Sequence, residues 1–385
     1  MKACANDLAN RQVLLPLPMA PLTACAASGS EVSLSPPRLD QAFVDGSVAG
    51  TSGRIPQVSS ALTYCDRWGS IKARWGVGRM HYAVDPGLYA LGSPDESSPV
   101  LVTANYKMTF DCLREALPGR NVWILVLDTD GINVWCAAGK GTFRTEELIR
   151  RITASGLKDV VKHRDLILPQ LGAPGVAAHL VRKQSGFKVH YGPILARDVA
   201  AYLDAGLRAT AAMRRKAFPL RERAVLIPIE IVAVLKPALV IIPILLLTSG
   251  FGGAGGFVQN MTHDGIFSLI AFLSAIFSGA VLTPLLLPYL PGRAFTTKGI
   301  AVGLPLAIAL LYAWGGDLRS WREILFGGAW LLIIPALSAY LAMNFTGAST
   351  YTSLSGVKRE MRWALPLEIG AGLYGFAILL ASRFF

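Results

Sequence analysis

The sequence predicts two parts: an α/β domain built on a parallel sheet, followed by an all-α bundle of five transmembrane helices. Between residues 58 and 206, short runs rich in Val, Leu and Ile alternate with amphipathic segments, which is typical of a parallel sheet covered on both faces. From residue 224 onward, the chain contains apolar runs long enough to cross a bilayer. The composition agrees, because 52% hydrophobic residues and a mean hydropathy of +0.44 are too high for an ordinary soluble protein.

The expected elements follow in chain order. Residues 1–57 are rich in Ala, Ser, Pro and Gly without a sustained period, which predicts a poorly ordered extension. In the α/β domain, residues 58–206, strands and helices are expected to alternate. The expected strands are 100–106, 122–129, 166–169 and 189–194, and the expected helices are 108–117, 145–155, 176–184 and 199–205.

The formal charge of +12 does not indicate a nucleic-acid partner. The basic excess clusters beside the first apolar run, where residues 207–223 contain six Lys and Arg residues against one Glu. A basic stretch flanking a membrane segment is the better interpretation, with membrane lipid as the partner. Residues 207–223 are therefore expected to be a juxtamembrane linker.

Residues 224–385 are expected to contain five spans, at 224–249, 265–290, 299–315, 324–343 and 363–382. If the α/β domain lies inside, the inner side receives six basic residues at 207–223, two at 291–298 and three at 344–362, or eleven in total. The outer side receives three, which are Arg319, Arg322 and Arg383. This bias predicts a multi-pass protein of the cell (inner) membrane with a cytoplasmic α/β domain.

One cysteine of the α/β domain lies in an unusual setting. Cys136 belongs to the segment 131–140, Gly-Ile-Asn-Val-Trp-Cys-Ala-Ala-Gly-Lys, between an apolar strand at 122–127 and an acidic helix start at 145–147. The small residues beside the thiol allow a large flat ligand to approach closely. A thiolate is a soft donor that favours a soft or borderline metal over Mg²⁺ or Ca²⁺. Ligands of such sheets bind beyond the carboxyl ends of the strands, where this segment is expected.

Simpler interpretations remain open. A free cysteine in an Ala-rich helix is most often a small buried hydrophobe, Trp135 is consistent with core packing, and Lys140 with a solvated side chain. Thr103 and Asn105 fit either a ligand site or ordinary loop capping. Three glycines either permit the close approach of a ligand or form tight turns, namely Gly172, Gly175 and Gly192.

The residues around Cys136 resemble a known signature. Asn-Val-Trp-Cys-Ala-Ala-Gly-Lys at 133–140 is similar to the motif of the mercury-methylating corrinoid proteins of the HgcA type. Shorter matches to that family lie at 102–107, 127–129, 169–173, 191–193, 344–347 and 353–357. The resemblance covers roughly residues 64 to 382, and residues 1–57 fall outside it.

The resemblance implies a Rossmann-like corrinoid-binding domain, related to that of the corrinoid iron–sulfur protein, joined to a membrane domain. It implies that Cys136 is the lower axial thiolate ligand of cobalt and that residues 132–140 form a cap helix against the corrin. Asn133 is expected to cap this helix and Gly139 to end it. The residues expected to bind the cofactor are Asn133, Val134, Trp135, Cys136, Ala137, Ala138, Gly139, Lys140, Thr103 and Asn105.

The function implied by the resemblance is a membrane-anchored corrinoid-dependent methyltransferase that passes a methyl group to Hg(II). The methyl group would come from a methylated folate-type donor or a methyl donor protein. A ferredoxin-like iron–sulfur protein would be the electron donor, since the five cysteines form no CxxC pair. Two alternatives predict other behaviour: a membrane transporter with a cytoplasmic α/β regulatory domain, or a corrinoid- or metal-binding module without catalytic activity.

Overall fold

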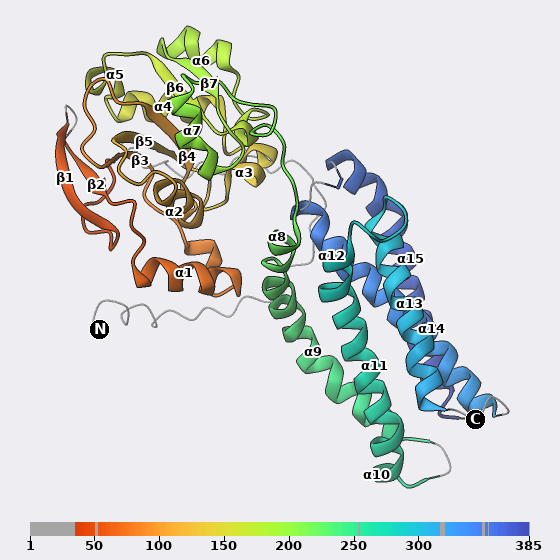
Figure 1. Cartoon of the computed structure of the whole chain (residues 1–385). Coiled ribbons are helices and arrows are strands. Elements are labelled where there is room, and N and C mark those ends of the chain that lie inside the picture. The colour runs from red at the N-terminus through yellow and green to blue at the C-terminus, as the bar shows by residue number, and fades with distance from the viewer. Residues whose placement is uncertain are drawn as a thin grey trace. The chain divides into compact units, whose positions relative to one another are not determined.

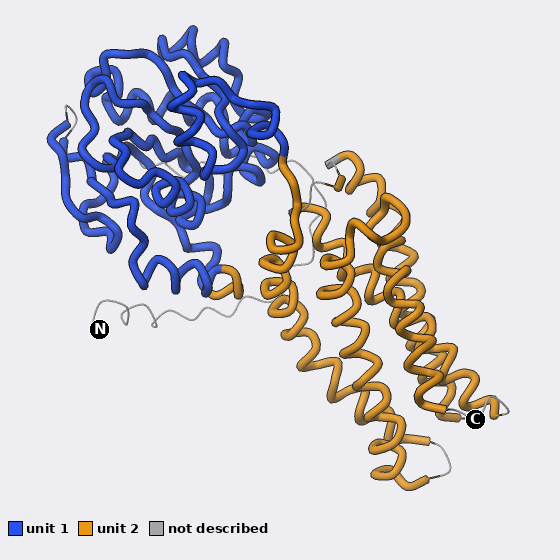
Figure 2. The backbone as a smooth tube through the Cα atoms, in the orientation of Figure 1, with its two compact units in different colours: residues 1–73, 78–215 blue, residues 74–77, 216–385 orange. Residues whose placement is uncertain are grey.

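The computed structural model describes residues 35–50, 53–252, 255–315, 320–348, 351–352 and 354–384. The chain divides into two compact units, which Figure 2 colours separately. Unit 1 comprises residues 1–73 and 78–215, and unit 2 comprises residues 74–77 and 216–385. The division at residue 215 falls inside the expected linker at 207–223.

In the described part of unit 1, seven strands form one mixed sheet in the order β1-β2-β3-β5-β4-β6-β7. β5, β4, β6 and β7 are parallel, whereas β3 is antiparallel to β5 and β1 is antiparallel to β2. The prediction of a parallel sheet is therefore confirmed for β5, β4, β6 and β7. It is wrong for the pairs β3–β5 and β1–β2, whereas β2 and β3 are parallel to each other. The strands are β1 Val44–Gly50, β2 Gly53–Val58, β3 Gly87–Leu91, β4 Val100–Ala104, β5 Val122–Leu127, β6 Asp165–Leu168 and β7 Lys188–Tyr191.

The expected extension is wrong at its C-terminal end, because β1 and all but the last residue of β2 lie inside residues 1–57 and form an antiparallel pair. Because β1 is rich in Gly, Ser and Ala, it lacks the apolar run that marks a strand. Its residues are only partly buried. In β2, Ile55 and Val58 are buried in the core. Residues 1–34 lie outside the described residues.

Helices cover both faces of the sheet (Figure 1). Alternate residues of β5 face opposite cores: Leu125 packs with α3, α4, α5 and α6, whereas Ile124 packs with α2 and α7. The helices of unit 1 are α1 Tyr64–Arg74, α2 Lys107–Glu115, α3 Val134–Lys140, α4 Thr145–Ala154, α5 Leu157–Val160, α6 Ala178–Ser185 and α7 Val199–Asp204. Short helical turns are η1 Arg79–His81, η2 Gln170–Gly172 and η3 Ala196–Asp198.

Unit 2 is helical, and five of its described segments are long and apolar enough to cross a membrane. These segments are Leu220–Gly250, Phe257–Leu286, Phe295–Trp314, Trp321–Gly347 and Ser355–Ala381, close to the five expected spans. The helices are α8 Leu220–Ala224, α9 Ile227–Gly250, α10 Phe257–Asn260, α11 Ile266–Phe277, α12 Thr283–Leu286, α13 Phe295–Trp314, α14 Trp321–Met343 and α15 Leu354–Ala381. Shorter turns are η4 Met261–Gly265, η5 Ser278–Leu282 and η6 Asn344–Ala348.

Small residues bring α13 against α14. A Cβ atom on Gly299 would lie 2.5 Å from the Cα atom of Ala339, and one on Gly303 would lie 2.8 Å from the Cβ atom of Ser338. Close backbone approach is how helices associate where lipid removes the hydrophobic driving force. The pairing of α13 and α14 is thus made by small residues that let the two backbones approach closely.

Several basic residues used to predict the topology have partners inside unit 2. The ammonium group of Lys298 donates to the carbonyls of Leu287 and Leu290, at 3.0 and 2.7 Å. Arg322 and Arg383, which were counted on the outer side, both form ion pairs with buried Asp264. Arg319 lies outside the described residues.

Candidate functional site

The candidate site lies where the parallel strands end. The loop at 128–133 follows β5 and leads directly into α3, which carries Cys136. η2 follows β6 and packs against α3. The carboxyl ends of neighbouring parallel strands thus converge on α3, which is the edge where sheets of this kind bind ligands.

Asn105, immediately after β4, fixes the loop at 128–133. Its side-chain oxygen Oδ1 accepts hydrogen bonds from the backbone nitrogens of Thr129 and Gly131, at 3.1 and 3.0 Å, and from the hydroxyl of Thr129 at 2.7 Å. Its Nδ2 atom donates to Asp128 Oδ1 at 3.2 Å. Asn105 is 6% exposed, so these bonds are shielded from water.

A second anchor comes from α4. The backbone nitrogen of Asp128 donates to Glu147 Oε1 at 3.0 Å, and Glu147 is held in turn by Arg151 at 2.6 Å. Both side chains are buried. The sequence indicated Glu147 only as part of an acidic helix start, so its role in holding the loop was missed.

The loop then turns through two residues with left-handed backbone. Asp130 has a φ angle of 56° and Gly131 one of 68°. A Cβ atom on Gly131 would lie 3.3 Å from the carbonyl oxygen of Met80. Left-handed conformations favour glycine and are tolerated by aspartate, so the sequence is suited to this turn.

Both ends of α3 are capped. The side chain of Asn133 accepts a hydrogen bond from the backbone nitrogen of Cys136 at 2.9 Å, which confirms the expected N-cap. The expected C-terminus is wrong, because Gly139 lies inside α3 and Gly141 ends it with a φ angle of 82°. The left-handed conformation that closes a helix falls on the later glycine.

The two faces of α3 differ in exposure. Val134 and Ala137 are buried in the core beneath the helix. Gly139 and Lys140 are exposed, and Ala138 and Cys136 are half-buried. Cys136 is a free thiol on the outward side. The small residues Ala138 and Gly139 lie beside Cys136, whereas the larger exposed side chains of α3 are Trp135 and Lys140.

Two other expected site residues have different positions. Trp135 is 47% exposed, so core packing does not explain it, and it lies on the outer side of α3. Thr103 lies inside β4 and is 3% exposed, so it packs within the sheet and does not share the exposed face with Cys136. Of the residues expected outside α3, only Asn105 acts on the segment that carries the thiol.

Two of the three candidate glycines support α3 from beneath. A Cβ atom on Gly175 would lie 1.9 Å from the carbonyl oxygen of Phe143, and one on Gly172 would lie 2.5 Å from the Phe143 ring. A Cβ atom on Gly192 would lie 3.2 Å from Ile167 Cγ2. These glycines allow chain segments to pack closely, which accounts for them without a ligand.

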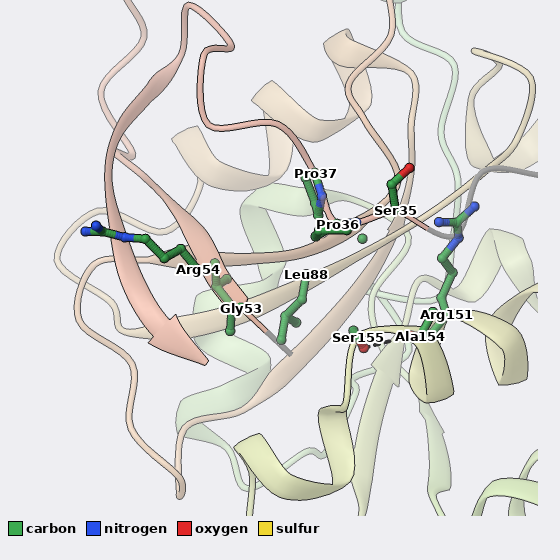
Figure 3. A pocket seen from close by; sticks show the side chains of 11 residues that line it. Ser35, Pro36, Pro37, Gly53, Arg54, Leu88, Arg151, Ala154 and Ser155 are labelled. Atoms are coloured by element: carbon green, nitrogen blue, oxygen red, sulfur yellow. Dashed lines mark hydrogen bonds between the residues drawn. The ribbon is translucent and has the colours of Figure 1, made fainter. Parts of the chain in front are cut away.

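Two surface cavities lie elsewhere in unit 1. One is lined in part by Pro37, Leu88 and Arg151 (Figure 3), and the other in part by Gln57, Ser59 and Asn121. Neither is lined by any residue of α3. The described residues also contain no cluster of three or more His, Cys, Asp and Glu side chains suited to a metal ion. Among the described residues, Cys136 therefore belongs to no such cluster.

Residues 77–203, which include α3, match the family model described as CO dehydrogenase/acetyl-CoA synthase delta subunit. The curated relatives include gamma subunits of acetyl-CoA decarbonylase/synthase complexes. That of Methanocaldococcus jannaschii is 41% identical over 97 residues, which are 25% of this chain and 20% of the relative. That of Methanopyrus kandleri is 34% identical over 123 residues, which are 31% of this chain and 26% of the relative. The chain thus spans about a quarter of the length of these relatives.

These matches correct the function expected from the signature at 133–140. The similar proteins are subunits of acetyl-CoA decarbonylase/synthase complexes and not mercury-methylating proteins, so the assignment to the mercury-methylating family is wrong. The expected methyl transfer to Hg(II), which depended on that assignment, is also wrong. The physical reason is that the residues at 133–140 determine how a helix with one thiol is held. They do not determine which molecule would receive a methyl group from a cofactor bound there. Apart from residue 77, the region that matches the family model lies within unit 1.

Proposed function

We propose that unit 1 binds a corrinoid and that the chain is a membrane-anchored carrier of methyl groups, in chemistry of the class performed by acetyl-CoA decarbonylase/synthase complexes. One observation carries the proposal: the region similar to subunits of these complexes contains α3, which presents Cys136 on its outer face. The matching family is one of corrinoid proteins. When bound, the corrinoid would supply a cobalt centre able to carry a methyl group.

The residues of α3 fit this cofactor. Cys136 offers one soft sulfur donor, and a thiolate is the form that binds a metal. If the corrinoid binds at α3, Cys136 Sγ would be the protein atom that holds its cobalt. Because Ala138 and Gly139 are small, α3 can lie close to a flat macrocycle, while Val134 and Ala137 fix the opposite face in the core.

The remaining side chains have positioning roles. Asn133 holds the first turn of α3 through the backbone of Cys136, and Asn105 holds the preceding loop. Both act on the position of the thiol through the backbone of the segment that carries it. Lys140 is exposed near the end of the helix, so its ammonium group is placed to donate a hydrogen bond to an amide at the edge of a corrin.

The partners follow from the chemistry. A carrier needs a donor of methyl groups, for which we propose a protein bearing a methylated folate-type compound. It also needs a low-potential electron donor to restore the cofactor after oxidation, for which we propose a ferredoxin-like iron–sulfur protein. The five apolar helices would anchor the chain in the cell membrane with unit 1 in the cytoplasm, as the distribution of basic residues favours.

The test uses the full chain, purified without oxygen in lipid nanodiscs and loaded with hydroxocobalamin. We expect the bound cofactor to have a visible spectrum different from that of the free cofactor, and Cys136→Ala to lose that difference. Cys65→Ala, which removes an exposed thiol on α1, is the matched control and should retain it. An unchanged spectrum in Cys136→Ala would refute ligation, and failure of every variant to retain cobalamin would refute corrinoid binding.

A further inference from the structure

We propose that α1 is an interfacial membrane helix whose exposed aromatic face binds the headgroup region of an anionic bilayer. The proposal rests on the membrane insertion of unit 2 proposed above, and it adds a second, peripheral contact with the same membrane. It assigns to unit 1 a lipid-binding surface that lies on the opposite side of α1 from its core-packing residues.

The exposed face is an apolar stripe. Tyr64, Trp68 and Ile71 are 79%, 49% and 46% exposed. At about 100° per residue these three positions fall within roughly 60° of one another around the helix axis. A helix of a soluble protein normally turns such a stripe toward the core, so this arrangement is the reverse of the usual one.

The opposite face of α1 is fixed in unit 1. Asp66, Gly69 and Ala73 are its buried residues. Asp66 forms ion pairs with Lys107 and Arg114 of α2, at 2.6 and 2.7 Å. A Cβ atom on Gly69 would lie 2.7 Å from the hydroxyl oxygen of Tyr82. These contacts prevent α1 from rotating to bury its aromatic stripe.

The start of the helix is also fixed. The backbone nitrogen of Thr63 donates to Asp66 Oδ2 at 2.9 Å, and the backbone nitrogen of Asp66 donates to Thr63 Oγ1 at 3.2 Å. This reciprocal pair is a capping box. The aromatic face is therefore a stable surface of the folded unit and not a frayed end.

The charged residues beside the apolar stripe indicate the kind of partner that it binds. Residues 64–73 contain two basic residues and one acidic residue, and the acidic one is the buried and paired Asp66. Around the helix axis, Lys72 lies on one side of the stripe and Arg67 lies on the other, 3.8 Å from Glu115. Tyr and Trp rings flanked by basic side chains are typical of a helix lying at an anionic membrane surface.

The chain itself brings this surface to a membrane. α7 ends at Asp204 and the first apolar segment begins at Leu220, so residues 205–219 join them. Even when fully extended, these 15 residues reach only about 50 Å. Because unit 1 is tethered at this distance, weak interfacial binding by α1 would be favoured by a high local concentration of lipid.

The test places a photo-cross-linking phenylalanine derivative in the full chain, reconstituted in nanodiscs that contain anionic phospholipid. The positions are Trp68 on the stripe, Leu239 on α9 as a membrane control, and His179 on α6 as an exposed control. We expect lipid adducts at Leu239 and at Trp68, with the yield at Trp68 at least about five-fold above that at His179.

Each other outcome has a defined meaning. Adducts at Leu239 with Trp68 no higher than His179, or with Trp68 linked to protein instead of lipid, would overturn the role of α1 alone. An absence of adducts at Leu239 would overturn the membrane insertion of unit 2 and this proposal with it. Lys72→Glu should lower the yield at Trp68 several-fold, whereas Lys183→Glu on α6 should leave it unchanged; equal effects would count against anionic lipid as the ligand.

Discussion

Asn105 binds Gly131 across 26 residues of sequence: its side-chain oxygen accepts a hydrogen bond from the Gly131 nitrogen at 3.0 Å. The first residue after β4 thereby sets the path of the loop after β5, and this path sets where α3 begins. The direction of Cys136 thus depends on a buried amide that does not touch it.

Asn105→Ala should destabilise unit 1 and loosen the loop at 128–133. It would leave the backbone donors of Thr129 and Gly131 buried without their acceptor, at a cost of about 2–4 kcal/mol. Thermal unfolding followed by near-ultraviolet circular dichroism measures the effect. Asn121→Ala is the control, because Asn121 is exposed and accepts one backbone hydrogen bond, from Ser93. Equal melting temperatures for the two variants would contradict the anchoring role.

Asn133→Ala should weaken cobalamin binding more than it weakens the fold. Loss of the N-cap costs about 1 kcal/mol, and this cost falls on the short helix that carries Cys136. Asn133→Ser keeps a capping oxygen and should restore most of the affinity. Equilibrium binding of cobalamin to the three forms measures this, and an affinity unaffected by Asn133→Ala would contradict the assigned position of the cofactor.

The sequence was sufficient for local features of the site. An apolar run that ends in a polar turn predicted β5, and the resemblance around Cys136 predicted a helix for which Asn133 was the expected cap. It was not sufficient to choose between Gly139 and Gly141 as the end of α3, because both are followed by residues that a helix or a loop tolerates. Composition alone does not show which glycine adopts a positive φ angle.

Features that depend on distant contacts were not predictable. β1 and β2 form strands because they pair with each other and with β3, although β1 lacks an apolar run. The direction of β3 depends on its position beside β5 and not on its own residues. The ion pairs of Asp66 join it to Lys107 and Arg114, which are 41 and 48 residues away in the sequence. No spacing pattern in the sequence predicts contacts over such distances.

Gly175→Ala should prevent unit 1 from packing normally. The added Cβ atom would lie 1.9 Å from the carbonyl oxygen of Phe143, and backbone cannot move aside as a flexible side chain can. We expect a loss of about 3 kcal/mol or more, seen as a lower melting temperature. Gly46→Ala is the control, since its Cβ atom would meet only the Gln57 side chain, whose flexible end lies at 3.1 Å. If the Gly175→Ala protein were as stable as the Gly46→Ala protein, the backbone at Gly175 and Phe143 would not be closely packed.

The ion pairs of Asp66 predict that unit 1 loses stability in acid. Burial alone raises the pKa of Asp66, but hydrogen bonds from Lys107 and Thr63 outweigh burial and hold this pKa well below its ordinary value. A carboxyl group whose pKa is lower in the folded state stabilises fully above its unfolded pKa of about 4. The stabilisation is lost as the pH falls from about 5 through the folded pKa.

Asp66→Asn tests this dependence, and the free energy of unfolding should be measured from neutral to acidic pH. At neutral pH the variant should lose about 3–5 kcal/mol, because it leaves Lys107 and Arg114 buried without this carboxylate. Its stability should also fall less steeply below pH 5 than that of the unchanged protein. Asp204→Asn removes an exposed pair with Arg120 and should alter neither property noticeably. If Asp66→Asn kept the acid slope of the unchanged protein, other carboxyl groups would have to account for it, and the buried pairs that orient α1 would be weaker than their geometry indicates.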